Sequence, residues 1–302
     1  MKHLHPRRLC RLVKNRVHDW FFYYLIPDEW EIRYRFKKKV GYSCNLKNPK
    51  SFNEKIQWIK LHDRNPLYPQ LTDKIEVKKY VARELGEEYV IPTLAGGFTH
   101  FDDIPFETLP EKFVLKSNHD SHNIIVCDDR RYFDYNYAKS KMERALARNY
   151  YNYWGKQWGY KDIKPQLFVE KYMDDGSRGL VDYKFHMFNG KCKCILFCSG
   201  RSDGDARFNF YDTDWNLLPF TRGGNNTDSD IPKPKNLDQM LKVAENLASM
   251  INNAFVRVDL YNINGKIFFG EFTFYPGGGI IPFQPIEWDY KMGAWLKLPE
   301  NS

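Results

Sequence analysis

Two acidic residues and an arginine alternate with apolar residues in segment 255–274. Asn264-Gly265 interrupts the alternation, and Asn-Gly between alternating segments is the strongest short-range signal of a β-hairpin. We predict a three-residue loop over 263–265, with Gly265 in the left-handed region and Arg257 opposite Glu271. One face then carries Arg257, Asp259, Glu271 and Thr273, and the other Val256, Val258, Leu260, Phe268, Gly270, Phe272 and Phe274. A two-residue turn would put the two carboxylates on opposite faces, so the apolar pattern favours the longer loop.

Two carboxylates on one face are the hard oxygen ligands that Mg²⁺ uses when phosphate oxygens complete its shell. Arg257 would then hold a negatively charged group. The alternative is a surface ion pair between Arg257 and Glu271. A ligand site is favoured by the segment Tyr275-Pro276-Gly277-Gly278-Gly279, because a glycine backbone can approach a ligand closely.

Two earlier segments carry further candidate binding residues. The strand predicted at Lys112–Lys116 ends in a lysine and leads into the polar loop 117–123, which suits phosphate binding. Its alternative is a solvated lysine at a strand edge. Segment 166–173 (QLFVEKYM) is an apolar strand that carries Glu170 and runs into Asp174 and Asp175; its alternative is an exposed acid and a turn.

The remaining pattern mixes helices with antiparallel strands. Ser51 and Glu54 have the spacing of a capping box before a helix over 51–62, and a second helix over 72–85 would be closed by Gly86. Further helices are predicted at 137–150 and 236–252, extended segments at 89–92, 112–116 and 124–127, and a hairpin at 185–197 around Asn189-Gly190. This order favours the α+β class over a doubly wound sheet.

The basic residues of this 302-residue chain are concentrated at the N-terminus. Residues 1–62 hold 15 Lys and Arg against 5 Asp and Glu. The segment 1–18, which is basic and has no acidic residue, precedes an aromatic and aliphatic stretch at 19–26. That order suits contact with an anionic membrane. The alternatives are an ordinary amphipathic helix packed on the main domain and, less favoured, nucleic-acid binding.

Composition excludes several classes of protein. Aromatic residues make up 17% of the chain and charged residues 28%, which argues against disorder, and the longest apolar run is far shorter than the roughly 20 residues of a spanning helix. The six cysteines form no regular framework, which predicts reduced thiols in the cytoplasm. Cys192, Cys194 and Cys198 would be a soft-metal site or, as we favour, buried small side chains.

Together these segments resemble the ATP-grasp superfamily, most closely its TupA-like branch, named for teichuronopeptide biosynthesis. The resemblance extends from about Ser51 to the C-terminus. It is carried, in order, by SFNEKIQWIKL, LTDKIEVKKYV, LPEKFVLKSNH, FVEKYM, VDYKFHMFNGK, DWNLLP and VRVDLYNINGKIFFGEFTFYPGGG. It implies an ATP-grasp fold with two α+β lobes that hold ATP, at about 71–168 and 169–302, after a basic and mainly helical region at 1–70.

The resemblance also implies roles for single residues. Lys74, Lys116 and Lys184 match phosphate-binding lysines, and Arg257 matches the arginine that steadies the acyl phosphate and the tetrahedral intermediate. The strand Glu170, Lys171, Tyr172 and Met173 would contact adenine, and Asp174 or Asp175 the ribose. Asp259 and Glu271 match the Mg²⁺ ligands, and Thr273 stands where many members have asparagine. The family's loop after the strand lysine is glycine-rich, whereas 117–123 has no glycine, so we expect His119, Ser121 and His122 to replace some amide contacts to phosphate, the histidines in protonated form.

The implied function is an ATP-dependent carboxylate–amine ligase of bacterial surface-polysaccharide assembly, with ATP and Mg²⁺ as cofactors. Its partners would be a sugar acid, free or on a carrier, and an amine or amino acid, and no nucleic acid is expected. One alternative is a nucleotide-sugar glycosyltransferase, suggested by Asp212-Thr213-Asp214 and Asp203-Gly204-Asp205. The other is a basic scaffold without activity on the membrane.

Overall fold

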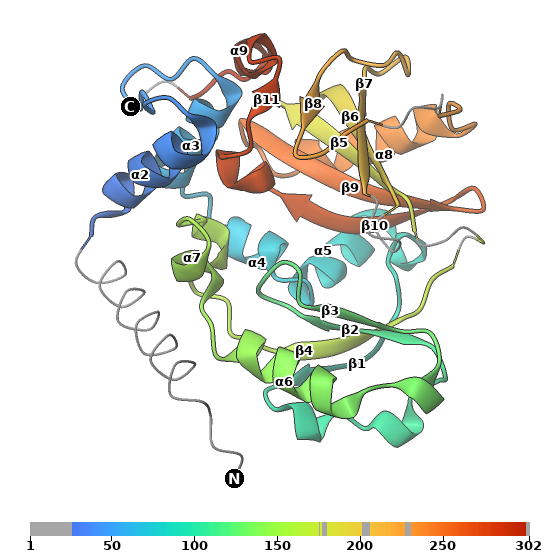
Figure 1. Ribbon diagram of the computed structural model, residues 1–302. Helices are drawn as coiled ribbons and strands as arrows, with labels where there is room; N and C mark the ends of the chain where they lie inside the picture. The colour runs from blue at the N-terminus through green and yellow to red at the C-terminus, as the bar shows by residue number, and fades with distance from the viewer. Residues whose placement is uncertain (1–25, 175, 177–179, 201–205, 227–230, 300–302) are drawn as a thin grey trace.

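The computed structural model describes residues 26–174, 176, 180–200, 206–226 and 231–299. These residues form two main antiparallel sheets, one above the other in Figure 1, with helices α4 (Tyr68–Thr72) and α5 (Glu76–Leu85) between them. Val77 and Val81 of α5 join the core of the upper sheet, while Lys78 of the same helix bonds to the lower one. Helix α5 therefore contacts both sheets.

The first sheet has four strands in the order β1-β4-β2-β3. They are β1 (Thr93–Phe98), β2 (Phe113–Ser117), β3 (Ile124–Cys127) and β4 (Leu167–Lys171). Helix α6 (Tyr135–Leu146) packs on this sheet through Ala138 and Met142, within a core that contains Phe101, Phe106 and Phe113. The first sheet thus has a hydrophobic core of its own.

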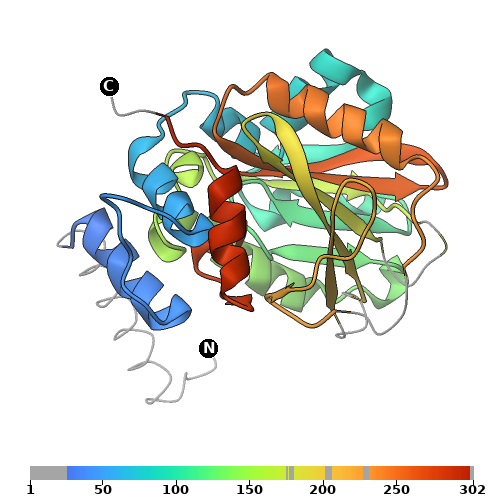
Figure 2. The ribbon, with the colours of Figure 1, turned by 90° about the horizontal axis from the view of Figure 1, so that it is seen from above.

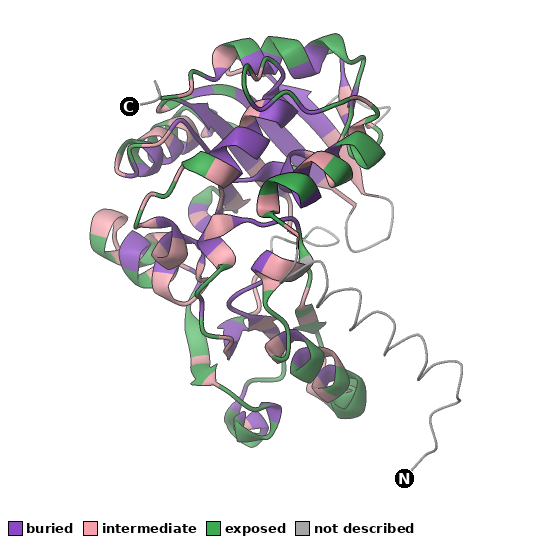
Figure 3. Cartoon of the chain, turned by 90° about the vertical axis from the view of Figure 1, so that its left-hand side faces the viewer, coloured by how far each residue is buried: buried purple, intermediate pink, exposed green. Residues whose placement is uncertain are grey.

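The second sheet has five strands in the order β10-β9-β5-β6-β7. They are β5 (Asp182–Phe188), β6 (Lys191–Ser199), β7 (Arg207–Tyr211), β9 (Phe255–Ile263) and β10 (Lys266–Thr273). Helix α8 (Leu237–Ser249) covers one face of this sheet (Figure 2), and its buried apolar residues join the core there. The opposite face carries the charged residues Arg257, Asp259 and Glu271. Figure 3 shows that the strands of this sheet are largely buried.

A third group of elements lies at the end of the second sheet. Helices α3 (Phe52–His62) and α9 (Glu287–Trp295) pack on each other beside the short pair β8 (Thr221–Arg222) and β11 (Phe283–Gln284). Helix α2 (Asp28–Val40) lies outside α3, and the short α7 (Tyr150–Tyr153) follows α6. Short 3-10 helices lie at Glu87–Tyr89, Phe101–Asp103, Phe106–Thr108, Arg130–Tyr132, Trp158–Tyr160 and Pro276–Gly279.

Most predicted elements are present, with shifted ends. The capping box is confirmed, since Ser51 Oγ accepts from Glu54 N at 3.2 Å and Glu54 Oε2 accepts from Ser51 N at 3.1 Å. The helix predicted at 72–85 begins only at Glu76, because Asp73 Oδ1 accepts from Ile75 N at 2.8 Å and breaks the preceding turn. The extended segment predicted at 89–92 is present only in part. A 3-10 turn ends at Tyr89, Val90 is extended and bridges Phe269, and the strand itself is Thr93–Phe98, whose two glycines hid it.

The division of the chain at residues 70 and 168 stays a prediction. Residues of α3, α4 and α5 share one hydrophobic core with the second sheet. Residues 1–25, and with them the predicted basic and aromatic stretch before Ile26, lie outside the described residues. Among the residues that are described, no helix has the length and apolar character needed to cross a membrane.

Candidate active site

The hairpin β9–β10 presents the predicted charged face, but by a different register. Ile263 pairs with Lys266, so the turn has two residues, Asn264 and Gly265, with φ of 52° and 84°. The predicted three-residue loop was therefore wrong. Gly270 is an extra residue between the pairs Phe269↔Leu260 and Glu271↔Asp259, and this bulge returns Glu271 to the face of Asp259.

The bulge also changes the apolar face. Phe269 and Ile267 occupy the buried positions, with 4% and 5% exposure, whereas Phe268 pairs with Tyr261 on the other side. The prediction that Phe268 belongs to the core face was wrong for the same reason as the loop: both assumed an uninterrupted ladder. Gly270 suits the bulge because a Cβ there would lie 3.0 Å from the Asp259 carbonyl oxygen.

Arg257 connects the acidic residues of this face. Its Nε and Nη2 donate to the two oxygens of Asp259 at 2.6 and 2.7 Å, and Nη2 also reaches Thr273 Oγ1 at 2.9 Å and Glu271 Oε1 at 3.3 Å. The Asp259 side chain is 2% exposed, whereas that of Glu271 is 36% exposed. The predicted grouping of Arg257, Asp259, Glu271 and Thr273 is confirmed, but Asp259 is buried and not solvent-facing.

Lys184 extends the cluster onto the neighbouring strand. It lies opposite Asp259 in the β5–β9 pairing, where its ammonium bonds to Asp259 Oδ2 and, at 3.1 Å, to Asp182 Oδ1. Burial alone would lower the pKa of Lys184, but Asp182 and Asp259 raise it above the usual value. Burial would likewise raise the pKa of Glu271, but Lys184, Arg257 and Lys74 bring it below the usual value. These groups are therefore charged at neutral pH.

The donors of this face fit Mg²⁺ in chemical type. Asp259, Glu271 and Thr273 offer carboxylate and hydroxyl oxygens on one surface, the ligands that Mg²⁺ prefers. In the described part of the chain, no group of three or more His, Cys, Asp and Glu is arranged to hold a metal. A divalent ion here would thus need oxygens from a second molecule, as a nucleotide phosphate supplies.

Glu170 links the predicted strand lysine to a lysine that the sequence analysis missed. Its carboxylate is 6% exposed and pairs with Lys116 of β2 and with Lys78 of α5. Burial would raise the pKa of Glu170, but the two lysines lower it below the usual value. Nothing in the sequence indicates that Lys78, and not its neighbour Lys79, contacts Glu170. Only the fold orients Lys78 toward β4.

The loop after Lys116 is held by side chains and not by glycines. Asp120 accepts bonds from Ser117 and Asn123, and its carbonyl oxygen accepts from the Lys74 ammonium. Backbone N–H of Lys74 donates to Asn118 O at 3.0 Å. Lys74 is thereby joined to the loop that contains the predicted phosphate contacts.

His119 does not face outward from this loop. It is 2% exposed, and its ring nitrogens lie 3.2 Å from Asn118 Oδ1 and 3.1 Å from Ala145 O. Burial lowers its pKa, so the expected role of a protonated His119 is not supported. His122 is exposed, and Ser121 is half-buried. Burial raises the pKa of Tyr150 to about 12 and that of Tyr160 above its usual value, while Ser121 opposes both shifts.

The two sheets bring their charged residues together around Tyr261. Burial raises the pKa of the Tyr261 hydroxyl, and the carboxylates of Asp182, Glu271, Glu170 and Asp259 raise it further. Glu170 belongs to the first sheet and the other three to the second. Beyond Glu170, Lys171 and Asp174 are exposed and Tyr172 and Met173 half-buried, while Asp175 lies outside the described residues.

The glycine segment after β10 forms a left-handed turn. Gly277, Gly278 and Gly279 have φ of 58°, 63° and 63°, a region that glycine enters without strain. Two buried residues of α3 hold it: Gln57 Nε2 donates to Gly279 O at 2.6 Å and Lys60 Nζ to Gly278 O at 2.6 Å. Gln57 and Lys60 were not predicted as site residues, although their spacing on the predicted helix places them on one face.

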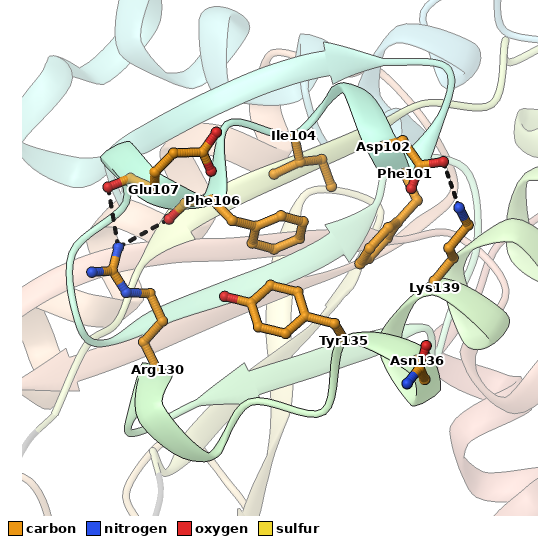
Figure 4. A pocket seen from close by; sticks show the side chains of 9 residues that line it. All are labelled: Phe101, Asp102, Ile104, Phe106, Glu107, Arg130, Tyr135, Asn136 and Lys139. Atoms are coloured by element: carbon orange, nitrogen blue, oxygen red, sulfur yellow. Dashed lines mark hydrogen bonds and ion pairs between the residues drawn. The ribbon is translucent and has the colours of Figure 1, made fainter.

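A separate pocket lies beside the first sheet and helix α6, away from these residues. Its volume is about 530 Å³. Phe101, Phe106 and Tyr135 are among the side chains that line it (Figure 4). Three of its charged side chains have partners: Lys139 pairs with Asp102, and Arg130 donates to the carbonyl oxygens of Phe106 and Glu107. The pocket contains none of the predicted site residues.

The other motifs have structural explanations or lie outside the described part. Asp212 Oδ1 accepts from Asp214 N and Asn216 N at 3.0 and 2.8 Å, so Asp212-Thr213-Asp214 forms a tight turn. Residues 203–205 lie outside the described ranges. Cys192, Cys194 and Cys198 are buried thiols, and burial raises the pKa of Cys192 to about 12.

Comparison with known proteins bears on this arrangement. The model of the TupA-like ATPgrasp family matches residues 54–297, a range that contains every charged residue of the cluster around Arg257 and both lysines at Glu170. The chain belongs to the TupA-like ATP-grasp family. This match identifies the fold as ATP-grasp, and the two antiparallel sheets of the structure are consistent with it. No curated protein sequence matches the chain.

Solved structures similar to this TupA-like chain include two D-alanine–D-alanine ligases. The enzyme from Bacillus anthracis, complexed with ATP, is 16% identical, with a TM-score of 0.39 over 68% of this chain and 53% of that one. The enzyme from Helicobacter pylori is 14% identical, with a TM-score of 0.46 over 83% and 70%. The chain thus spans about half the length of the Bacillus anthracis ligase, and the fold assignment rests on the family match.

Proposed function

We propose that this protein is an ATP-dependent carboxylate–amine ligase that forms ADP and an amide. The observation that carries the proposal is the meeting of charges from both sheets around Tyr261, where Glu170 of the first sheet joins Asp182, Asp259 and Glu271 of the second. Glu271 is also under the electrostatic influence of Lys184, Arg257 and Lys74. Lysines that can bind anions, beside two carboxylates, are suited to bind a nucleoside triphosphate together with a divalent cation.

The residues divide the work of such a reaction. Lys74, Lys116 and Lys184 would bind phosphate oxygens and neutralise their charge, and Arg257 would steady the acyl phosphate and the tetrahedral intermediate. Asp259, Glu271 and Thr273 would hold Mg²⁺, which supplies charge neutralisation when bound. We keep Glu170, Lys171, Tyr172, Met173 and Asp174 as the adenosine contacts and Ser121 as a phosphate contact.

The acid would attack the γ-phosphorus through a carboxylate oxygen, and ADP would leave. The amine would then attack the acyl carbon, and inorganic phosphate would leave with the carboxylate oxygen. Both steps require positioning more than covalent chemistry by the protein. Lys78 adds a second cation to Glu170 and would keep that carboxylate ionised while Lys116 turns to the nucleotide.

For the substrates, we propose a uronic or related sugar acid, free or linked to a carrier, and an amine or amino acid, in the assembly of a bacterial capsule, O-antigen or teichuronopeptide. The support is the resemblance to the TupA-like branch. The reaction would take place in the cytoplasm, and residues 1–26 would bring the enzyme to the inner face of the membrane.

The test measures ADP release with Mg²⁺-ATP over a panel of sugar acids and amines, with one substrate carboxylate labelled with ¹⁸O. We expect the label in the released phosphate, because the acyl phosphate transfers a carboxylate oxygen. Unlabelled phosphate during amide formation would contradict the proposal. A glycosyltransferase would instead consume a sugar nucleotide, and the tight turn at Asp212-Thr213-Asp214 gives that alternative no support.

A further inference from the structure

Helix α2 exposes two large aromatic side chains on one stripe. Trp30 is 72% exposed and Tyr34, one turn later, is 57% exposed. The opposite stripe, Ile32 and Phe36, is buried against the domain at 1% and 0%. The helix is thus anchored on one side, and its aromatic side faces outward.

The same outward side continues into Lys37 and Lys38, and Lys39 follows at the end of the helix, on the side of Ile32. Lys37, Lys38 and Lys39 form the last turn of α2 and are exposed, and Lys38 Nζ lies 5.7 Å from the Tyr34 ring centroid. Across the described ranges, no carboxylate lies within ion-pair distance of these three lysines.

The acids of α2 do not cancel that charge. Glu29 pairs with Arg33 at 2.8 Å, Glu31 with Arg35 at 2.7 Å, and Asp28 with Lys156 at 3.3 Å. Each acid already has its own basic partner. The positive charge of the last turn is therefore available to an external anion.

Helix stability explains only part of this pattern. Lysines in a last turn interact favourably with the helix dipole. That effect gives no reason for an exposed tryptophan and tyrosine on the stripe that leads to the lysines. Interfacial helices combine these features, because aromatic rings lie at the headgroup level of a bilayer and lysines contact lipid phosphates.

We propose that α2 docks the folded domain on an anionic lipid surface, with Trp30 and Tyr34 at the headgroups and Lys37–Lys39 on the lipid phosphates. A second protein chain fits less well, since two aromatic side chains are far fewer than the roughly 20 residues per side of a stable interface. The helix lies outside the segment 54–297 that matches the family, which suits an attachment role. Docking would bring the proposed site to a carrier-linked substrate, but vesicle binding itself does not require the ligase chemistry.

The experiment uses the full chain and vesicles of phosphatidylcholine, alone or mixed in equal parts with phosphatidylglycerol, in a flotation assay without nucleotide. One variant carries Lys37→Gln, Lys38→Gln and Lys39→Gln, and another Trp30→Ala and Tyr34→Ala. The matched control carries Lys233→Gln, Lys235→Gln and Tyr132→Ala, which are exposed residues elsewhere. A last variant carries Arg7→Gln, Arg8→Gln and Arg11→Gln. Circular dichroism and an ATP thermal shift check folding and the nucleotide site separately.

We expect binding only to the anionic vesicles, weakening as salt rises. The lysine variant should bind about a hundredfold more weakly, at about 1 kcal/mol per lysine. The aromatic variant should also lose binding, and the control should bind like the parent. The proposal is overturned if the parent does not bind anionic vesicles, if the α2 variants bind like the parent whatever the arginine variant does, or if the α2 variants only convert a dimer into a monomer. The ATP shift reports on the proposed ligase independently of each outcome.

Discussion

Asp259 bonds two cations at once, Lys184 and Arg257, in a position with almost no exposure to solvent. Glu271, directly opposite, is more than a third exposed and has one weaker contact with Arg257 at 3.3 Å. The two carboxylates have the same proposed role, yet their removal should affect folding differently.

Asp259→Asn should lower the free energy of unfolding by about 3 kcal/mol or more, because it leaves buried cations without their partner. Glu271→Gln should cost less than about 1 kcal/mol, since its pair is partly exposed. Both should abolish Mg²⁺-dependent ATP turnover. Urea unfolding of both variants, beside an ADP-release assay, measures the contrast, and equal stability losses would contradict it.

Glu170 predicts an acid dependence of stability. Lys116 and Lys78 hold its pKa below the usual value in the folded state, so the unfolded chain binds a proton first as pH falls. The resulting stability is present above about pH 4.3 and is lost as pH falls through the lower, folded pKa. Glu170→Gln should therefore flatten the decline of unfolding free energy below about pH 4, and a decline as steep as that of the parent would argue against the two ion pairs.

Separation along the sequence explains which site residues could be predicted and which could not. Arg257, Asp259, Glu271 and Thr273 could be predicted because strand alternation places them on one face within a single hairpin. Lys78, Gln57 and Lys60 could not, because their partners Glu170, Gly278 and Gly279 are at least 90 residues away in sequence. His119 is a residue type that can bind phosphate, but its ring contacts the carbonyl oxygens of Ala145 and Arg148 at the end of α6.

The hairpin β9–β10 reaches the expected faces through a tight turn and a bulge. These two irregularities compensate each other, since each one alone would move Glu271 to the core face. Periodicity shows which faces must exist, but it does not locate the extra residue.

Gly270→Ala should therefore act on the site, and Gly265→Ala only on stability. The first adds a Cβ 3.0 Å from Asp259 O, and the second forces alanine to a φ of 84° at the turn. Both should cost about 1 to 2 kcal/mol. Only Gly270→Ala should also weaken the stabilisation by Mg²⁺-ATP in a thermal-shift titration, and an equal loss for Gly265→Ala would refute this distinction.

Helix α3 offers a matched pair of lysines. Lys60 donates to Gly278 O at 2.6 Å, in the turn that follows β10, and Lys55 donates to Gly293 O at 2.8 Å, in α9. Lys60→Met should loosen the glycine turn and reduce ADP release strongly. Lys55→Met, which removes a comparable bond far from the site, should leave ADP release near that of the parent.

Lys60 also gives a pH signature that an ordinary structural lysine lacks. Burial, with Arg35, lowers its pKa to about 7, although Glu31 opposes the shift. Between about pH 7 and 10 the unfolded chain holds a proton that the folded chain does not, so this group makes stability rise with pH by at most about 1.4 kcal/mol per unit. The parent should show this slope relative to Lys60→Met in unfolding measured over that range, and identical pH profiles would contradict it.

The molecule as a whole combines two sheets that the sequence predicts separately. The α+β class, most helices and the hairpins follow from local periodicity and turn residues. The meeting of Glu170 with Asp182, Asp259 and Glu271 around Tyr261 depends on how one sheet lies over the other, which no local pattern contains. Family resemblance supplied that arrangement, and the structure supplies its contacts.

The most direct test of the account is calorimetric titration of ATP, with and without Mg²⁺, into the parent, Lys116→Ala and Glu271→Gln. We predict Mg²⁺-dependent ATP binding by the parent and a loss of that Mg²⁺ dependence in Glu271→Gln. Lys116→Ala should weaken ATP by about tenfold or more but adenosine little, because its ammonium acts on phosphate charge, and the difference should shrink as salt rises. Binding of a uridine sugar nucleotide in place of ATP, or ATP binding that neither substitution changes, would contradict the proposed site.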